Sequence, residues 1–359
     1  MSSYDELWKH WYEAQLNEQQ YNRDSFSSVS EKPSLRPARH FDPSEDAEVL
    51  RKAMKGLGTN EDDIVRILTQ RTLNQRMEIQ EKYQQIHGRD LVKDLEKELS
   101  GIFEKVILSL LKPLPLFFAE QIKHATKGAG TDEGALIEIL CTRDDNSLKT
   151  IKETFEEEYH KSIEEVVCKE TGGDFEKLLM SIMAFSRDDS ASSPSDVADE
   201  LINEDIDEDN IRRIVTSYTF QFLNRVFNEY QEKTGEEFIQ LIEKKCSGSS
   251  EKAFKAIYLT SKSRPEYYAN ALHEAMDGAG TDDWPLIRII VSRCEIDLGT
   301  IEEKYNELYE KDLIEQGNSP EFKPKVLLKF KRLLTEFAMD ISKIRPLRDF
   351  NEIYKICRK

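Results

Sequence analysis

A Gly-x-Gly-Thr string recurs three times along the chain, within residues 54–59, 126–131 and 276–281. The first two copies are 72 residues apart, and the third lies 150 residues further on, which is two steps of 75. A fourth copy is therefore due near Asn203, where the chain reads Leu-Ile-Asn-Glu-Asp instead. Periods of this length are typical of arrays of similar helical units. The sequence thus predicts four units, of which the third has lost its glycine loop.

Other strings keep the same phase, so the period does not depend on the glycines alone. One string ends in an aromatic residue and occurs at 79–83, 151–155, 226–230 and 301–305. Another begins with glycine and occurs at 101–106 and 173–178, and more weakly at 248–253. Arg71, Arg143 and Arg293 hold one register, with Tyr218 at the third position. Chance does not bring several independent strings into one phase.

Apolar residues inside each unit follow helical spacing. In the first unit Ala47, Leu50 and Ala53 form one stripe, and Thr59 is predicted to cap the next helix, with Asp62 three residues on. No segment reads as a strand, which predicts an all-α fold with about five short helices in each unit. The expected divisions are an N-terminal tail at 1–40, units at 41–112, 113–186, 187–262 and 263–342, and a basic C-terminal tail at 343–359.

The charge balance restricts what the chain can bind. Its 359 residues carry a formal net charge of −18, so nucleic acid and anionic lipid are both repelled beyond a screening length of about 8 Å. A site for either must first recruit cations. No run approaches the ~20 apolar residues of a membrane span, and the N-terminus lacks the pattern of a secretory signal. The five cysteines match no metal motif, so we expect reduced thiols in a cytoplasmic protein, with Cys141 and Cys294 buried.

The repeated loop has a chemistry that suits a hard cation. Glycine tolerates positive φ, so successive carbonyls can turn to one side. Calcium takes about 6–8 oxygen ligands, commonly with a bidentate carboxylate, and Glu98 and Glu170 stand 42 residues after Gly56 and Gly128. A phosphate cradle fits less well, because no P-loop lysine follows and the three acids at 61–63 would repel a nucleotide. A plain capped turn with solvated glutamates at helix ends stays open at this point.

These strings, their order and the 42-residue offset resemble the annexins over about residues 38–334. The resemblance implies a slightly curved all-α disc, with Ca²⁺ loops on its convex face, that docks reversibly on anionic phospholipid. It assigns three main-chain carbonyls and one carboxylate to each loop. In the first loop these are the carbonyls of Met54, Gly56 and Gly58 with the carboxylate of Glu98. In the second loop they are the carbonyls of Thr126, Gly128 and Gly130 with the carboxylate of Glu170. The resemblance also implies secondary sites, at Thr59 with Glu61 and at Leu99 with Glu104.

One carboxylate with neutral carbonyls makes a weak calcium site, for which we expect an affinity of about 10⁻⁴–10⁻³ M. Water or a lipid head group would fill the remaining positions around the ion. Lipid would then complete the coordination, and the binding of ion and membrane would reinforce each other.

The third unit departs from this pattern. Lys245 stands where the carboxylate belongs, and its charge opposes a cation, so we expect this unit to bind no calcium in the family's manner. The acidic stretch 205–209 is not an EF-hand, because Asn210 and Thr216 stand where that loop needs glycine and glutamate. A solvated acidic turn is expected instead.

The fourth unit keeps Met276, Gly278 and Gly280 as loop residues, but the position 42 residues after Gly278 is a proline. Glu321 can supply the acid only if the register shifts by one. Trp284, close to this loop in sequence, suits either a contact with the membrane interface or a half-buried core position.

The resemblance also implies a polar channel between the two halves of the molecule. Glu138, Arg143 and Arg288 match its lining, whereas Phe118 and Gln121 stand where acids are common. Ion conduction is therefore less supported here than in the family at large.

The N-terminal tail carries an apolar helical face made of Leu7, Trp8, Trp11 and Tyr12. This face resembles annexin tails that bind partner proteins as amphipathic helices, and burial in the repeats and self-association are equal alternatives. The Ser/Pro-rich segment 25–37 is expected to be a mobile linker.

Together these features predict a protein without a catalytic centre that binds anionic, phosphatidylserine-like membranes peripherally through Ca²⁺. Such a protein would act as a scaffold in membrane organisation, trafficking or repair, and would bind no nucleic acid. The six histidines have no Ser or Cys partner in a recognisable motif. The alternative function is a calcium-independent helical-repeat scaffold that binds proteins through its N-terminal helix.

Overall fold

The computed structural model describes residues 31–56, 58–128, 130–190, 192–276 and 283–309, and these residues form seventeen α-helices and no β-strand. The predicted all-α class is therefore confirmed. The predicted N-terminal helix and the basic C-terminal tail lie outside the described residues. Within the described ranges, no helix is both long enough and apolar enough to cross a bilayer.

The helices follow one another in four units. The first unit holds α2 (Pro43–Ala53), α3 (Glu61–Leu68), α4 (Leu73–His87), α5 (Leu91–Glu98) and α6 (Gly101–Leu110). The second holds α7 (Leu114–Ala125), α8 (Glu133–Leu140), α9 (Asp145–Tyr159), α10 (Ile163–Glu170) and α11 (Gly173–Ile182). The third holds α12 (Pro194–Ile202), α13 (Glu208–Ser217), α14 (Phe220–Thr234), α15 (Phe238–Lys245) and the start of α16 (Gly248–Met276). The rest of α16, with α17 (Asp283–Arg293) and α18 (Leu298–Tyr309), belongs to the fourth.

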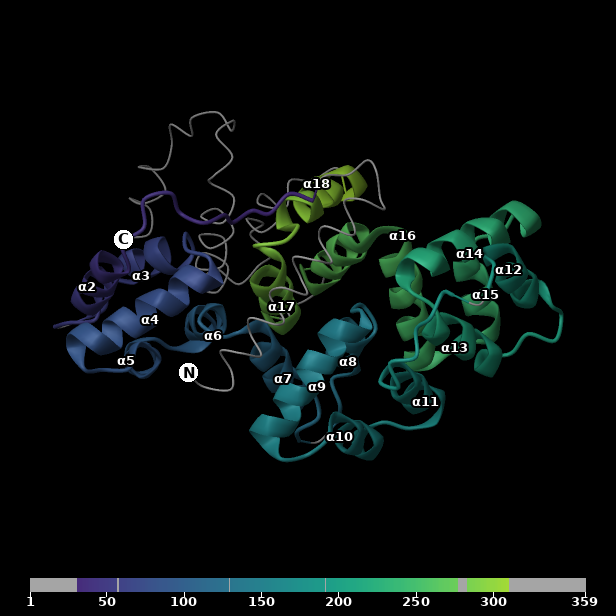
Figure 1. Cartoon of the computed structure of the whole chain (residues 1–359), viewed down its shortest axis with the longest axis horizontal. Helices are drawn as coiled ribbons and strands as arrows, with labels where there is room; N and C mark the ends of the chain where they lie inside the picture. The colour runs from purple at the N-terminus through teal and green to yellow at the C-terminus, as the bar shows by residue number, and fades with distance from the viewer. Residues whose placement is uncertain (1–30, 57, 129, 191, 277–282, 310–359) are drawn as a thin grey trace, which may run out of the picture.

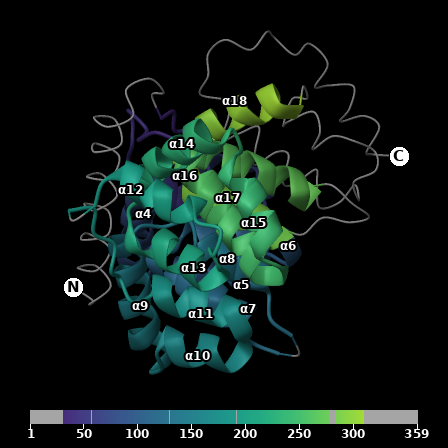
Figure 2. The same cartoon turned by 90° about the vertical axis from the view of Figure 1, so that its right-hand side faces the viewer.

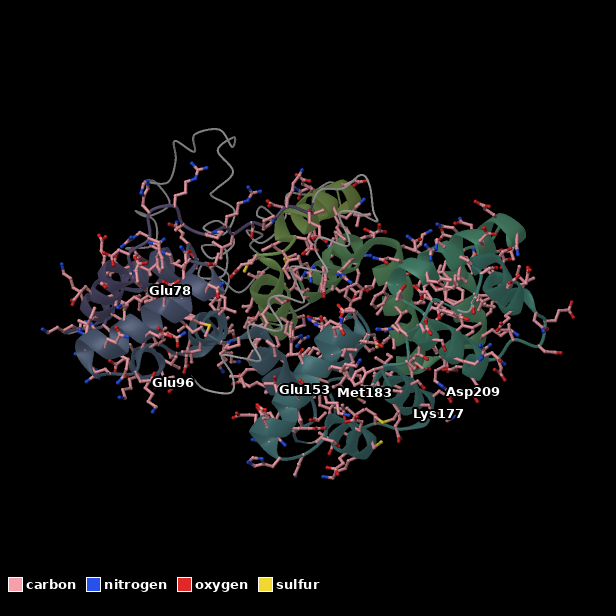
Figure 3. All side chains as sticks on the ribbon, in the orientation of Figure 1. Glu78, Glu96, Glu153, Lys177, Met183 and Asp209 are labelled. Atoms are coloured by element: carbon pink, nitrogen blue, oxygen red, sulfur yellow. The ribbon has the colours of Figure 1, made fainter. Side chains whose placement is uncertain are left out.

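The four units lie side by side in the plane of Figure 1, with the first at the left, the third at the right, and the second and fourth between them. Helix α6 packs against α17, α8 against α16, and α11 against α13. The fourth unit contacts the first through α17 and α6, and it contacts the second through the ion pair of Arg288 in α17 with Glu138 in α8. Figure 2 views the molecule from the side of the third unit. Lys177 of α11 and Asp209 of α13, whose charged atoms are 4.0 Å apart, lie at the junction of the second and third units (Figure 3).

Helix α16 connects the third unit to the fourth without a loop. Ser263 interrupts α16 with a φ of −161° and a ψ of 99°, so the helix consists of two segments that meet at this residue. Pro265 follows two positions later and has no backbone N–H to donate to the preceding turn. The local sequence thus explains why one long helix does not continue straight between the units.

The predicted apolar stripes form the core. Ala47 and Leu50 of α2 are fully buried, as are Ile64 and Leu68 of α3. Cys141 and Cys294 are also buried, and burial raises the pKa of each thiol to about 12.

Trp284 lies where the fourth unit meets the first two. Its half-buried ring packs against the core, 5.4 Å from the ring of His124 in α7 and 4.9 Å from the ammonium of Lys105 in α6. These contacts favour the core alternative for this side chain over a contact with the membrane.

Thr59 does not cap α3, contrary to the sequence prediction. Asn60 occupies the N-cap position, and its side-chain oxygen accepts a hydrogen bond of 3.3 Å from the backbone N–H of Asp63. The Thr59 hydroxyl instead donates to Glu98, at 2.8 Å. The hydroxyl therefore has a partner outside its own helix, and the neighbouring amide takes over the cap.

The prediction of a mobile linker over 25–37 is wrong for its second half, because residues 31–38 form a strap that joins the fourth unit to the first. The Lys32 carbonyl accepts from Gly299 N–H at 2.8 Å, and Leu35 N–H donates to the Cys294 carbonyl at 2.9 Å. At the other end, the side chain of Gln75 in α4 makes two hydrogen bonds to the backbone of Ala38, of 3.0 and 3.2 Å. Composition could not reveal these bonds, since most of them use backbone groups.

Replacing Gly299 by alanine is expected to loosen this strap. A Cβ at this position would lie 2.8 Å from the Lys32 carbonyl oxygen, so the strap backbone must move. We expect the free energy of unfolding to fall by about 1–3 kcal/mol, as for other overpacked sites, and the amides of Lys32 and Leu35 to exchange faster with solvent. Gly172→Ala is the matched control, because its Cβ would meet nothing within 4 Å. Equal amide exchange in the two variants would contradict this account.

The third helix of each complete unit ends in a left-handed residue. Gly88 and Gly235 take this position in the first and third units, with φ of 63° and 75°, but the second unit has His160, with φ of 54°. A residue with a Cβ pays about 1–2 kcal/mol for this conformation, and His160 is exposed. We expect His160→Gly to raise the free energy of unfolding by about 1 kcal/mol, measured by chemical denaturation, whereas Gly88→Ala should lower it. A loss of stability in His160→Gly would show that the imidazole makes a compensating contact.

Candidate metal-binding loops

The first glycine loop turns back on itself between α2 and α3. Met54 caps the end of α2, and Asn60 N–H closes the loop by donating to the Ala53 carbonyl at 2.9 Å. Gly56 and Gly58 have φ of 116° and 86°, which residues with a Cβ rarely adopt. The backbone therefore follows a path on which peptide oxygens of neighbouring residues can face the same point.

The second loop has the same design. Thr126 caps the end of α7, and Asp132 N–H donates to the Ala125 carbonyl at 2.9 Å. Gly128 and Gly130 have φ of 113° and 98°, close to the values in the first loop. Two loops 72 residues apart in sequence thus share both their closing hydrogen bond and their two positive φ angles.

The structure brings each loop together with its distant glutamate. Glu98 is the last residue of α5, and its carboxylate accepts the Thr59 hydroxyl bond described above. Glu170 is the last residue of α10, and the Thr131 hydroxyl donates to its carbonyl at 2.7 Å. The Glu170 carboxylate is 3.6 Å from the ammonium of Lys169, so in this unit the side-chain acid is not bonded to the loop threonine.

These residues fit a calcium ion. Peptide carbonyls and one carboxylate are the oxygen ligands that Ca²⁺ prefers. No group of three or more His, Cys, Asp or Glu side chains capable of holding a metal exists in the described parts of the chain. A site here would therefore depend mainly on backbone oxygens, as the positive φ angles at the glycines indicate.

The residues of the secondary sites lie at neighbouring helix ends. Leu99 caps the C-terminus of α5, and Glu104 lies in the first turn of α6, on the other side of Gly101, which has a φ of 69°. Thr59 and Glu61 flank the start of α3, where the Thr59 hydroxyl is already bonded to Glu98.

The second unit shows a contact that sequence reasoning missed. Glu133, the counterpart of Glu61, accepts a hydrogen bond from the hydroxyl of Ser249, which belongs to the third unit. The repeat register identifies Glu133 as a counterpart of Glu61, but no pattern within one unit could show that the next unit supplies its partner.

The third unit has a different loop. Residues 203–207 connect α12 to α13 in five residues, none with positive φ, where the first two loops use seven. The Lys245 ammonium, at the end of α15, is 3.5 Å from the Glu204 carbonyl. A lysine charge thus lies beside a loop carbonyl, and the acidic residues 204, 205 and 207 are exposed, as expected for a solvated turn.

The described residues include only the start of the fourth loop. Met276 is the buried last residue of α16, whereas Gly278, Gly280 and Glu321 lie outside the described residues.

The comparisons with known proteins agree on one family. The family model described as Annexin matches residues 45–110, 117–182, 201–257 and 267–316. The chain is 41% identical to annexin A5 of Rattus norvegicus over 301 residues, which cover 80% of this chain and 94% of that protein. It is 40% identical to annexin A4 of Mus musculus over 293 residues, 78% of this chain and 91% of that protein. Against annexin A6 of Rattus norvegicus the identity is 38% over 312 residues, but these span only 46% of that longer relative.

Solved structures agree with the sequences. The structure of annexin III has a TM-score of 0.79 at 34% identity, with 86% of this chain and 98% of that chain covered. A crystal structure of calcium-bound annexin (Sm)1 has a TM-score of 0.76 at 28% identity, with 88% and 94% covered.

Proposed function

Because this chain belongs to the annexin family, we propose that it binds anionic phospholipid membranes through calcium ions held by its glycine loops. The carbonyls of Met54, Gly56 and Gly58 with the Glu98 carboxylate would form the first site. The carbonyls of Thr126, Gly128 and Gly130 with Glu170 would form the second. Met276, Gly278 and Gly280, with Glu321 or water, would form a weaker third.

One observation carries this proposal. The Thr59 hydroxyl and the Glu98 carboxylate are 2.8 Å apart although 39 residues separate them, so the fold itself holds the acid against the glycine loop. Preorganisation of this kind lowers the cost of ordering the ligands around an ion. A chain with a net charge of −18 also needs a cation between itself and an anionic surface.

In this mechanism calcium acts as a bridge. The protein supplies few charged ligands, so an ion keeps open positions that a lipid phosphate or carboxylate can fill. The affinity for calcium should therefore rise when anionic vesicles are present, and the affinity for vesicles should rise with calcium by the same factor. We extend the proposal to a role as a peripheral scaffold in membrane organisation, trafficking or repair.

Vesicle co-sedimentation tests the proposal. The protein should pellet with phosphatidylserine-containing vesicles in the presence of calcium, remain in solution with a chelator, and remain in solution with neutral phosphatidylcholine vesicles under both conditions. Failure to pellet with calcium on anionic vesicles would contradict calcium bridging. It would favour the alternative function, a protein-binding scaffold acting through the tail residues Leu7, Trp8, Trp11 and Tyr12.

A further inference from the structure

Arg143 is a buried guanidinium without an acidic partner. It is 9% exposed, and its Nη1 donates to the carbonyls of Glu138 and Ile139 at 2.7 and 2.9 Å. The arginines in the same register have carboxylate partners, since Arg71 pairs with Asp46 at 2.6 Å and Arg293 with Asp297 at 2.6 Å. Among the described residues, no carboxylate lies within 4.0 Å of Arg143. Leaving a buried charge uncompensated is costly, so this position calls for an anion.

Phe118 explains why the partner is missing. Its ring stands where an acid was expected from the resemblance, and its centroid is 3.8 Å from the Arg143 Cζ. Stacking covers the face of the guanidinium but leaves its edge free. No described protein atom accepts a hydrogen bond from Nε or Nη2 of Arg143, and neither atom is sealed from solvent. These two nitrogens form the fork that matches two oxygens of an oxyanion.

Arg143 lines a cleft between the second and fourth units. The cleft is partly open to solvent and has a cavity volume of about 20 Å³. Its polar lining consists of three arginines, three hydroxyl residues and one acid: Arg143, Arg264, Arg293, Thr142, Ser147, Ser292 and Asp144.

The acids around the cleft are already engaged or lie at its edge. Asp144 is the acid in the lining, and it caps α9 by accepting the Ser147 N–H at 2.8 Å. Asp297 is paired with Arg293, and the charge of Glu31 also acts on Arg293. Burial lowers the pKa of Arg143 and the positive charge of Arg293 adds to this shift, whereas the charges of Tyr268 and Glu138 oppose it. Arg143 thus lines the cleft without a carboxylate in ion-pair contact among the described residues.

The cleft lies away from the calcium loops. Gly130 precedes α8 and Arg143 follows it, so the eight-residue helix, about 12 Å long, separates them. A lipid head group bound at the second loop therefore cannot reach Arg143, and the ligand must come from solution.

We propose that this cleft binds a small free oxyanion of the phosphate class, with the Arg143 guanidinium as its bidentate ligand. The hydroxyls of Thr142, Ser147 and Ser292 also line the cleft, but each donates its proton to a protein oxygen, so the Arg143 guanidinium supplies the donors. Binding at this place would add negative charge between the second and fourth units and stabilise their contact, because it compensates a guanidinium that the fold leaves unpaired.

Isothermal titration of the calcium-free full chain with inorganic phosphate, at ionic strength matched with chloride, tests this proposal. The wild type should show saturable binding. Arg143→Gln should weaken it by about tenfold or more, because the fork is lost. Phe118→Asp should weaken it similarly, because the new carboxylate competes for Arg143. Arg66→Gln removes an exposed arginine of α3 and should leave the affinity unchanged.

Two further measurements keep the test decisive. If Phe118→Asp does not fold, Arg143→Lys retains the charge without the fork and should still weaken phosphate binding about tenfold. Arg143→Gln should keep its calcium-dependent binding to anionic vesicles, which separates this site from the proposed membrane function. Absence of saturable phosphate binding by the wild type, or equal affinities in Arg143→Gln and Arg66→Gln, would overturn the proposal.

Discussion

Replacing Glu98 and Glu170 together by glutamine is expected to raise the calcium concentration for half-maximal vesicle binding by on the order of tenfold or more. Each substitution removes the only carboxylate proposed for its loop and leaves the peptide oxygens in place. Vesicle binding uses several loops at once, so the loss of two sites also lowers the avidity of the whole surface. Co-sedimentation with phosphatidylserine vesicles over a calcium titration measures the effect.

Matched controls are available among the exposed acids of the same two units. Glu96 of α5 and Glu153 of α9 are exposed acids, visible in Figure 3, and Glu96→Gln with Glu153→Gln removes the same total charge. Lys245→Gln probes the third unit, where we expect no calcium site. Neither control should change the calcium requirement by more than about twofold, as for surface substitutions of small effect. An unchanged calcium requirement in the Glu98/Glu170 variant would show that the ligand assignment is wrong, even for a chain of this family.

The repeat phase made most of the fold predictable. Within one unit, apolar residues at helical spacing decide which face is buried, as Ala47 and Leu50 show. The loop geometry was also predictable, because only glycine adopts the φ angles of Gly56 and Gly58 at little cost. The offset of 42 residues then identified Glu98 as the acid that meets this loop.

Contacts between units could not be predicted in this way. The bond from Ser249 of the third unit to Glu133 of the second depends on how helices of different units pack. The prediction that Thr59 caps α3 was wrong because the Thr59 hydroxyl bonds to a residue 39 positions away rather than to a backbone group of its own turn. Periodicity describes one unit at a time and carries no information about partners in other units.

Removing the carboxylate of Glu138 is expected to lower the free energy of unfolding more than any of the other single substitutions proposed for this protein. Glu138 of α8 accepts a hydrogen bond of 2.8 Å from Arg288 of α17, so this ion pair joins the second unit to the fourth. Both side chains are almost fully buried, at 5% and 3% exposure. Burial raises the pKa of Glu138, and the charge of Arg288 opposes that rise. Glu138→Ala would leave Arg288 buried without its counter-ion, which typically costs about 3–5 kcal/mol.

Chemical denaturation measures this loss, and two further variants identify its cause. Glu200→Ala breaks the ion pair with Arg213, whose side chains are 48% and 53% exposed, and should cost less than about 1 kcal/mol. Glu138→Leu combined with Arg288→Met removes both charges and fills the space, so most of the lost stability should return. If the double variant is as unstable as Glu138→Ala, the cost comes from lost packing rather than from an unpaired guanidinium. In that case the pair would fix the relative position of the two units by its shape and not by its charge.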